Sequence, residues 1–145
     1  MMGMSLALLF LLAVTSTVGA LQCHSCHNVI PPYPDCEKAL NWKPFTDCSS
    51  RYGFVTRCGN MNGILSSRYH QVFSELKDVE LDCMEFDPSH VPENKCYHDE
   101  EALPWIMDNT PWSLMPPSID LKSMTFEFKG TLCICDTDWC NGALP

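Results

Sequence analysis

Near its end the chain reads Leu132-Cys133-Ile134-Cys135-Asp136-Thr137-Asp138-Trp139-Cys140-Asn141, which places three cysteines inside eight residues. The first cysteines stand in a similarly dense segment, Leu21-Gln22-Cys23-His24-Ser25-Cys26. The chain has ten cysteines in all, at positions 23, 26, 36, 48, 58, 83, 96, 133, 135 and 140. This density is typical of small oxidised scaffolds, in which disulfides replace much of the hydrophobic core.

An apolar leader precedes the cysteines. Residues 5–14 are apolar and uncharged, and the small residues Val18-Gly19-Ala20 follow them. This pattern predicts a signal peptide over residues 1–20, a secreted extracellular product, and a single domain over residues 21–145. No later stretch approaches the roughly 20 apolar residues that a spanning helix needs, so we expect no membrane span.

The formal net charge is −9. Residues 75–101 contain ten acidic residues against Lys77 and Lys95, and therefore carry most of the excess negative charge. Nucleic acid and anionic lipid are unsuitable partners for such a chain. The acidic window is interpreted as a solvated face, with electrostatic steering of a basic receptor surface as the functional alternative.

Local patterns predict the regular elements. A strand is expected over 52–58, followed by a turn at 59–63 that is rich in Gly and Asn. Apolar residues at helical spacing predict a short helix over 69–79, and alternation predicts a strand over 79–83. The four prolines within 103–119 favour an irregular loop, and Met124, Phe126 and Phe128 alternate with polar residues as in a strand.

The two cysteine-rich ends together resemble the Ly6/uPAR three-finger family, through L-x-C-x-x-C at residues 21–26 and C-x-x-x-x-C-N at residues 135–141. The spacing alone leaves on the order of 900 possible pairings. The resemblance implies a small disulfide-rich all-β fold, in which Asn141 stabilises the base of the fingers. It also implies five bonds: Cys23 with Cys58, Cys26 with Cys36, Cys48 with Cys83, Cys96 with Cys133, and Cys135 with Cys140.

This chain departs from the family pattern at three points. Relatives have adjacent cysteines where this chain has Cys133-Ile134-Cys135, and we expect a bulge or turn near Ile134 so that both sulfurs reach their partners. The long intervals from Cys58 to Cys83 and from Cys96 to Cys133 predict long second and third fingers. Many relatives carry a hydrophobic tail that is exchanged for a glycolipid anchor, whereas residues 141–145 do not form such a signal.

Two short motifs suggest rival functions. Cys23, Cys26 and His27 form C-x-x-C-H, the attachment motif of c-type haem, which would make the chain an exported haem protein. Cys96-Tyr97-His98-Asp99 resembles part of the active site of small secreted phospholipases, which gives a disulfide-rich hydrolase as the alternative function. Zinc on Cys26, His27 and Cys36 conflicts with thiol oxidation during secretion. We expect no enzymatic activity, no cofactor and no metal.

The aromatic residues of the predicted third finger are the candidate contact residues. Trp105 and Trp112 lie among prolines that restrict the loop, and aromatic anchors on a restrained loop lose little entropy on binding. The alternative is that they cover the sheet. The resemblance implies a non-enzymatic module that modulates a cell-surface receptor or ion channel, with nicotinic-type receptors as the first candidates. Invertebrate Ly6-related proteins of the odour-response type are the most similar subgroup, which suggests neuronal or chemosensory signalling.

Overall fold

A computed structural model describes residues 20–28, 36, 44–49, 53–110 and 120–142. Residues 1–19 of the predicted signal peptide, and Trp112, lie outside the described residues. In the described part the chain forms a small, mostly β structure that is cross-linked by five disulfides. None of its described helices has the length and apolar character that crossing a bilayer requires.

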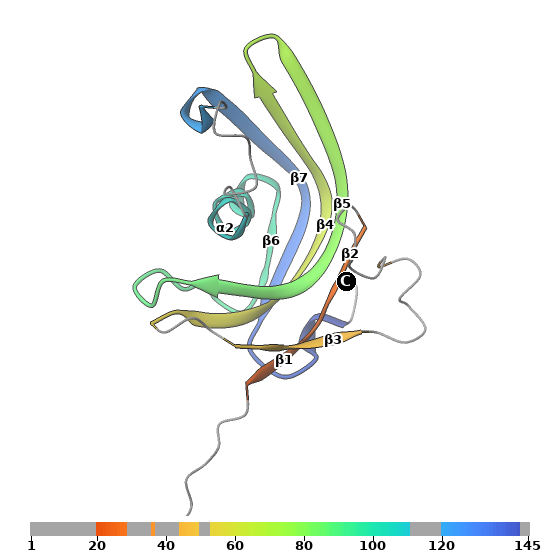
Figure 1. Cartoon of the computed structure of the whole chain (residues 1–145), viewed down its shortest axis with the longest axis vertical. Helices are drawn as coiled ribbons and strands as arrows, with labels where there is room; N and C mark the ends of the chain where they lie inside the picture. Colours follow the sequence, from red (N-terminus) through yellow and green to blue (C-terminus); the bar gives the residue numbers. More distant parts are fainter. Residues whose placement is uncertain (1–19, 29–35, 37–43, 50–52, 111–119, 143–145) are drawn as a thin grey trace, which may run out of the picture.

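Two antiparallel sheets contain the described strands (Figure 1). The smaller sheet pairs β1 (Leu21–His24) with β3 (Phe45–Cys48). The larger sheet has the strand order β2-β5-β4-β7-β6. Its members are β2 (Cys26–His27), β4 (Val55–Tyr69), β5 (Val72–Phe86), β6 (Cys96–His98) and β7 (Met124–Cys135).

The helical elements are short. The helix α2 (Leu103–Asn109) lies on the concave side of the curved large sheet (Figure 1). Three 3₁₀ turns complete the described elements: η2 (Asp99–Glu101), η4 (Leu121–Ser123) and η5 (Cys140–Gly142).

The strands β4 and β5 form one long hairpin, and the predicted turn at 59–63 and helix over 69–79 are both wrong. Pairing continues without a break from Val55↔Phe86 to Tyr69↔Val72. The apparent helical spacing arises because both faces of β5 carry apolar side chains: alternation places Val72 and Leu76 on one face and Phe73 and Val79 on the other. The strands predicted over 79–83 and 124–128 are confirmed within β5 and β7.

Gly63, which lies in the turn predicted over 59–63, permits close packing of β4 against β7. A Cβ on Gly63 would lie 2.6 Å from the ring of Phe128, which packs over this position. Gly63 is directly opposite Gly130 of β7, and a Cβ on Gly130 would lie 2.3 Å from the Asn62 carbonyl oxygen. Glycine therefore marks a close approach of two strands here and not a reversal of the chain.

Residues 103–109 form α2, so the irregular loop predicted over 103–119 is wrong for this part. Pro104 lies in the first helical turn, where its missing N–H costs no hydrogen bond. At the other end, the Asn109 side chain accepts a hydrogen bond from the Glu85 N–H at 2.8 Å, and the Thr110 hydroxyl donates to the Ile106 carbonyl at 2.8 Å. The helix is thereby attached to β5.

The bulge predicted near Ile134 is also wrong. The register between β4 and β7 is continuous from Tyr69↔Met124 to Cys58↔Cys135. Cys133 and Cys135 do share one face of the strand, but their partners lie in different places. Cys96 is directly opposite Cys133 on β6, whereas Cys140 lies beyond the end of β7. Regular backbone therefore satisfies both bonds.

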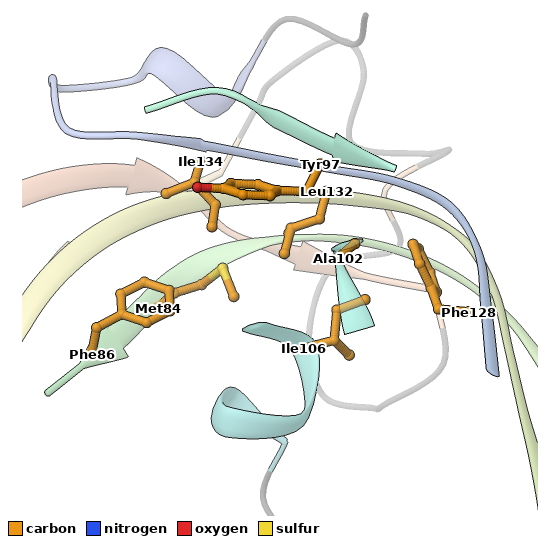
Figure 2. Close-up of a cluster of buried hydrophobic side chains, with 8 residues drawn as sticks. All are labelled: Met84, Phe86, Tyr97, Ala102, Ile106, Phe128, Leu132 and Ile134. Atoms are coloured by element: carbon orange, nitrogen blue, oxygen red, sulfur yellow. The ribbon is translucent and has the colours of Figure 1, made fainter. Parts of the chain in front are cut away.

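The main hydrophobic core fills the space between the concave face of the sheet and α2. Figure 2 shows side chains from β7, β5, β6 and the helical segment meeting there. The buried members are Met84, Phe86, Tyr97, Ala102, Ile106, Phe128, Leu132 and Ile134. Alternation along β7 places its apolar side chains in this core and Cys133 and Cys135 on the opposite face.

Candidate partner-binding surface

Sulfur bridges hold the strands together at one end of the large sheet. The five bonds are Cys23–Cys58, Cys26–Cys36, Cys48–Cys83, Cys96–Cys133 and Cys135–Cys140, the same pairs that the family resemblance implies. Two of the bridges touch, since the sulfurs of Cys23 and Cys48 are 3.0 Å apart. Because these two bridges join β1 to β4 and β3 to β5, four strands meet at one buried point. We call the region around the Cys23–Cys58 and Cys48–Cys83 bridges the base.

Asn141 links three segments of the base by hydrogen bonds. Its side-chain oxygen accepts from the His24 N–H at 2.9 Å, and its side-chain nitrogen donates to the carbonyls of His24 and Gly59, each at 2.9 Å. The Asn60 side chain donates to the Asn141 backbone carbonyl at 3.3 Å. Asn141 is 2% exposed, so these bonds satisfy polar groups that water does not reach. These hydrogen bonds lie where the family resemblance implies a role for Asn141.

The other end of the β4–β5 hairpin projects away from β1 and β3 (Figure 1). The chain reverses through His70 and Gln71, between the paired residues Tyr69 and Val72, and His70 has a positive φ of 52° that a tight turn requires. Val72 is 66% exposed and Phe73 is 55% exposed. We call residues 64–77 the hairpin tip.

Apolar side chains occur on both faces of the hairpin tip. Leu76 shares a face with Val72, and Ile64 shares the other face with Phe73; all four are exposed. The Arg68 guanidinium lies 5.9 Å from the centre of the Phe73 ring, directly across the strand pair. The hydroxyls of Ser67 and Ser74 are 2.7 Å apart and join the strands. The tip thus exposes a hydrophobic surface on a hydrogen-bonded frame.

Trp105, one of the two predicted contact residues, lies on α2 against the main core. Its ring contacts Phe86 at 6.0 Å and Tyr97 at 5.8 Å between centroids, and stacks on His90 at 4.7 Å. Its position satisfies the alternative interpretation that this residue covers the sheet. The apolar spacing over residues 69–79 predicts a helix and thereby conceals the hairpin tip. The sequence signal that identifies the tip is the presence of β-branched and aromatic residues on both sides of a two-residue turn.

A second exposed aromatic group lies at the base. Phe45 and Trp139 are both exposed, with ring centroids 4.9 Å apart. Trp139 has a positive φ of 67°, and its backbone N–H donates to the Gln22 carbonyl at 2.7 Å. Asp138 accepts from the Gln22 N–H at 2.9 Å. These bonds attach the last disulfide loop to β1, and the aromatic pair covers part of the base.

The residues on which the haem and phospholipase alternatives depend form disulfides or hydrogen bonds within the fold. Cys23 and Cys26 are bonded to Cys58 and Cys36, which uses the two thiols that haem attachment requires. The Asp99 carboxylate accepts from the Gly130 N–H at 2.9 Å, and the His98 ring lies 3.2 Å from the Thr131 hydroxyl. His98 and Asp99 therefore help to attach the η2 segment to β7.

The acidic window runs along β5 and through η2. Hydrogen bonds from the side chain and backbone of Ser89 hold the pKa of the exposed Asp87 below its usual value. Within β5, Glu80 and Asp82 approach His27 of β2. These three are one of two described groups whose atoms could hold a metal ion; the other, Cys23, Cys48 and Cys83, is already consumed by disulfides.

Comparison with known proteins gives no relative. No model of a known family matches the chain, and neither the curated proteins nor the solved structures contain a match.

Proposed function

We propose that this chain is a secreted, non-enzymatic binding protein of the Ly6/uPAR three-finger type, which modulates a cell-surface receptor or ion channel through the tip of its β4–β5 hairpin. The observation that carries the proposal is the separation of two regions. The base contains four strands that meet at touching sulfur bridges, and the hairpin tip exposes apolar side chains away from it.

The arrangement of strand pairs supports the three-finger assignment. The pairs β1–β3, β4–β5 and β6–β7 are each antiparallel, and both strands of each pair contain a disulfide cysteine. A domain of this size buries a limited core, and bridges at the base release the outer ends of the strands from packing. The disulfide pairs and the hydrogen bonds of Asn141 agree with what the family implies.

The composition of the hairpin tip indicates the kind of contact it makes. Val72 and Phe73 offer apolar area, and Arg68 adds a guanidinium beside an aromatic ring. Aromatic and arginine side chains on an ordered backbone are typical of residues that contribute most to binding energy. Because the strands are already paired, little backbone entropy is lost on docking. The partner surface should therefore contain an apolar pocket, as a receptor ectodomain offers.

The net charge of −9 adds a long-range electrostatic contribution to partner binding. An acidic protein is attracted to basic surfaces, and such attraction raises the association rate more than the final affinity. By the family resemblance, receptors of the nicotinic type and neuronal or chemosensory membranes are the first places to search.

A pair of phenylalanines permits a matched binding experiment. Phe73 at the tip is 55% exposed and Phe45 at the base is 54% exposed. Saturation binding of the labelled, oxidised protein to neuronal membranes should fall about tenfold or more in Phe73→Ser, since loss of a central aromatic anchor costs about 2 kcal/mol. Phe45→Ser should bind within about twofold of the original.

Two results would contradict the proposal. One is the absence of saturable binding to any such membrane. The other is an equal loss of binding in Phe73→Ser and Phe45→Ser, which would show that the tip has no special part in recognition. Far-UV circular dichroism and non-reducing peptide mapping of both variants would confirm that the fold is intact.

A further inference from the structure

Three metal-ligating side chains converge where β2 pairs with β5. The His27 Nε2 atom lies 3.2 Å from Asp82 Oδ2, and the His27 Nδ1 atom lies 3.5 Å from Glu80 Oε1. One ligand atom from each of the three residues falls within 4.8 Å of the others. The imidazole is 8% exposed, whereas the two carboxylates are 33% and 28% exposed, so the group is buried on one side and reachable from solvent on the other.

The backbone fixes this arrangement. His27 is directly opposite Glu80 in the β2–β5 register, so both side chains leave the sheet on the same face. Asp82 stands two residues further along β5 and shares that face. The convergence is therefore built into strand pairing and does not depend on a chance meeting of long surface side chains.

Hydrogen bonds from neighbouring residues orient Asp82. Its Oδ1 atom accepts from the Cys83 N–H at 2.8 Å and from the Ser25 hydroxyl at 3.3 Å. The other oxygen, Oδ2, is thereby directed at His27. Carboxylates that ligate metals are commonly held in this way, with one oxygen hydrogen-bonded to the protein.

We propose that His27, Glu80 and Asp82 form a Zn²⁺ site. Tetrahedral zinc with ligand bonds of about 2.0 to 2.2 Å separates adjacent ligand atoms by about 3.3 to 3.6 Å. The Nε2–Oδ2 distance of 3.2 Å is close to that spacing. The ion binds Nε2 and Oδ2, Glu80 turns on its partly exposed side chain to supply the third ligand, and water completes the coordination.

The ligand types select the metal. One imidazole with two carboxylates suits Zn²⁺, whereas Ca²⁺ and Mg²⁺ prefer sites made of oxygen alone. All described cysteines are in disulfides, so thiolates do not compete for the ion. Bound zinc would attach the two-residue strand β2, next to the Cys26–Cys36 bridge, to the central hairpin. This site is independent of the binding function proposed above.

Titration of the oxidised protein with Zn²⁺ tests the site. Isothermal calorimetry should give one Zn²⁺ per chain, and Co²⁺ should give the visible absorption of a four-coordinate site. Glu80→Gln with Asp82→Asn keeps side-chain shape and the hydrogen-bond acceptor for Cys83, and should weaken Zn²⁺ binding about tenfold or more. His27→Gln should do the same. An excess of Ca²⁺ should not displace Zn²⁺.

His98→Gln is the matched control, since His98 is an exposed histidine beside the acidic run Asp99-Glu100-Glu101. This variant should retain full Zn²⁺ affinity. Equal weakening in His98→Gln and His27→Gln would overturn the proposal, because binding would then reflect scattered surface histidines. Failure of the original protein to bind Zn²⁺ more tightly than the Glu80→Gln, Asp82→Asn variant would also overturn it.

Discussion

Phe45 and Phe73 are almost equally exposed, at 54% and 55%, yet they lie in regions that are built differently. Phe45 is at the base, where its ring meets Trp139 and its strand is attached through Cys48 to β5. Phe73 is at the hairpin tip, beyond the sulfur bridges, with Arg68 across the strand pair. Figure 1 shows the two regions at opposite ends of the β4–β5 hairpin.

The base is fixed by several independent kinds of interaction, whereas the hairpin tip is fixed mainly by strand pairing. Sulfur bridges, buried side-chain hydrogen bonds of Asn141 and strand pairing all act at the base. At the tip the strand ladder is the main constraint, supplemented by the contact between Ser67 and Ser74. Stability should therefore be concentrated at the base, and the tip should tolerate sequence change because few interactions depend on its side chains.

The largest effect is expected from removing the Cys48–Cys83 bridge by a double substitution to alanine. This bond spans 35 residues, and its loss should lower the free energy of unfolding by about 2 to 5 kcal/mol. Removing Cys26–Cys36, which spans 10 residues, should cost about 1 kcal/mol less if chain entropy dominates. Urea denaturation measures both. Equal losses would show that loop length does not govern the stability of the base.

Asn141→Ala should have the next largest effect. The substitution removes the hydrogen bonds that the Asn141 side chain makes, in a buried site, with the His24 N–H and with the carbonyls of His24 and Gly59. Each unsatisfied buried group costs about 1 to 3 kcal/mol, and partial hydration of the new space should limit the total to about 3 kcal/mol. Asn62→Ala, at an exposed position of β4, is the control and should change stability by less than about 0.5 kcal/mol.

Trp105→Ala tests whether Trp105 of α2 contributes to stability, as the base does, or to recognition, as proposed for the hairpin tip. The ring packs on Phe86 and Tyr97, so its removal should lower the free energy of unfolding by about 2 to 3 kcal/mol, somewhat less than for a fully buried tryptophan. Chemical denaturation followed by circular dichroism measures the loss. Unchanged stability combined with weaker partner binding would instead assign Trp105 to recognition, as the sequence first suggested.

The sequence predicted the base well because cysteines and the final Asn141 carry a position-specific signal. Their spacing alone left the pairing open, and family resemblance supplied the pairs that the structure contains. The predicted bulge at Ile134 failed for a different reason. Cys133 and Cys135 do share one face of β7, but Cys96 lies opposite Cys133 and Cys140 lies beyond the end of the strand, so both bonds form without a bulge.

The hairpin is harder to predict, because β5 is exposed on both faces over the tip. Strand alternation is visible when one face is buried and the other is polar. Val72, Phe73 and Leu76 alternate between faces that are both exposed, so their spacing imitates a helix. The His27, Glu80 and Asp82 group had no local signature either, since β-pairing joins residues more than 50 positions apart.

The smallest expected effect on stability is that of Phe73→Ser. Its exposed ring contributes little burial, so the free energy of unfolding should change by less than about 0.5 kcal/mol. Phe45→Ser should cost about 0.5 to 1.5 kcal/mol, because the contact with Trp139 is lost at the base. Parallel urea titrations would measure the difference between two equally exposed rings. A larger loss in Phe73→Ser than in Phe45→Ser would mean that the tip supports the fold, which removes the physical reason for assigning recognition to it.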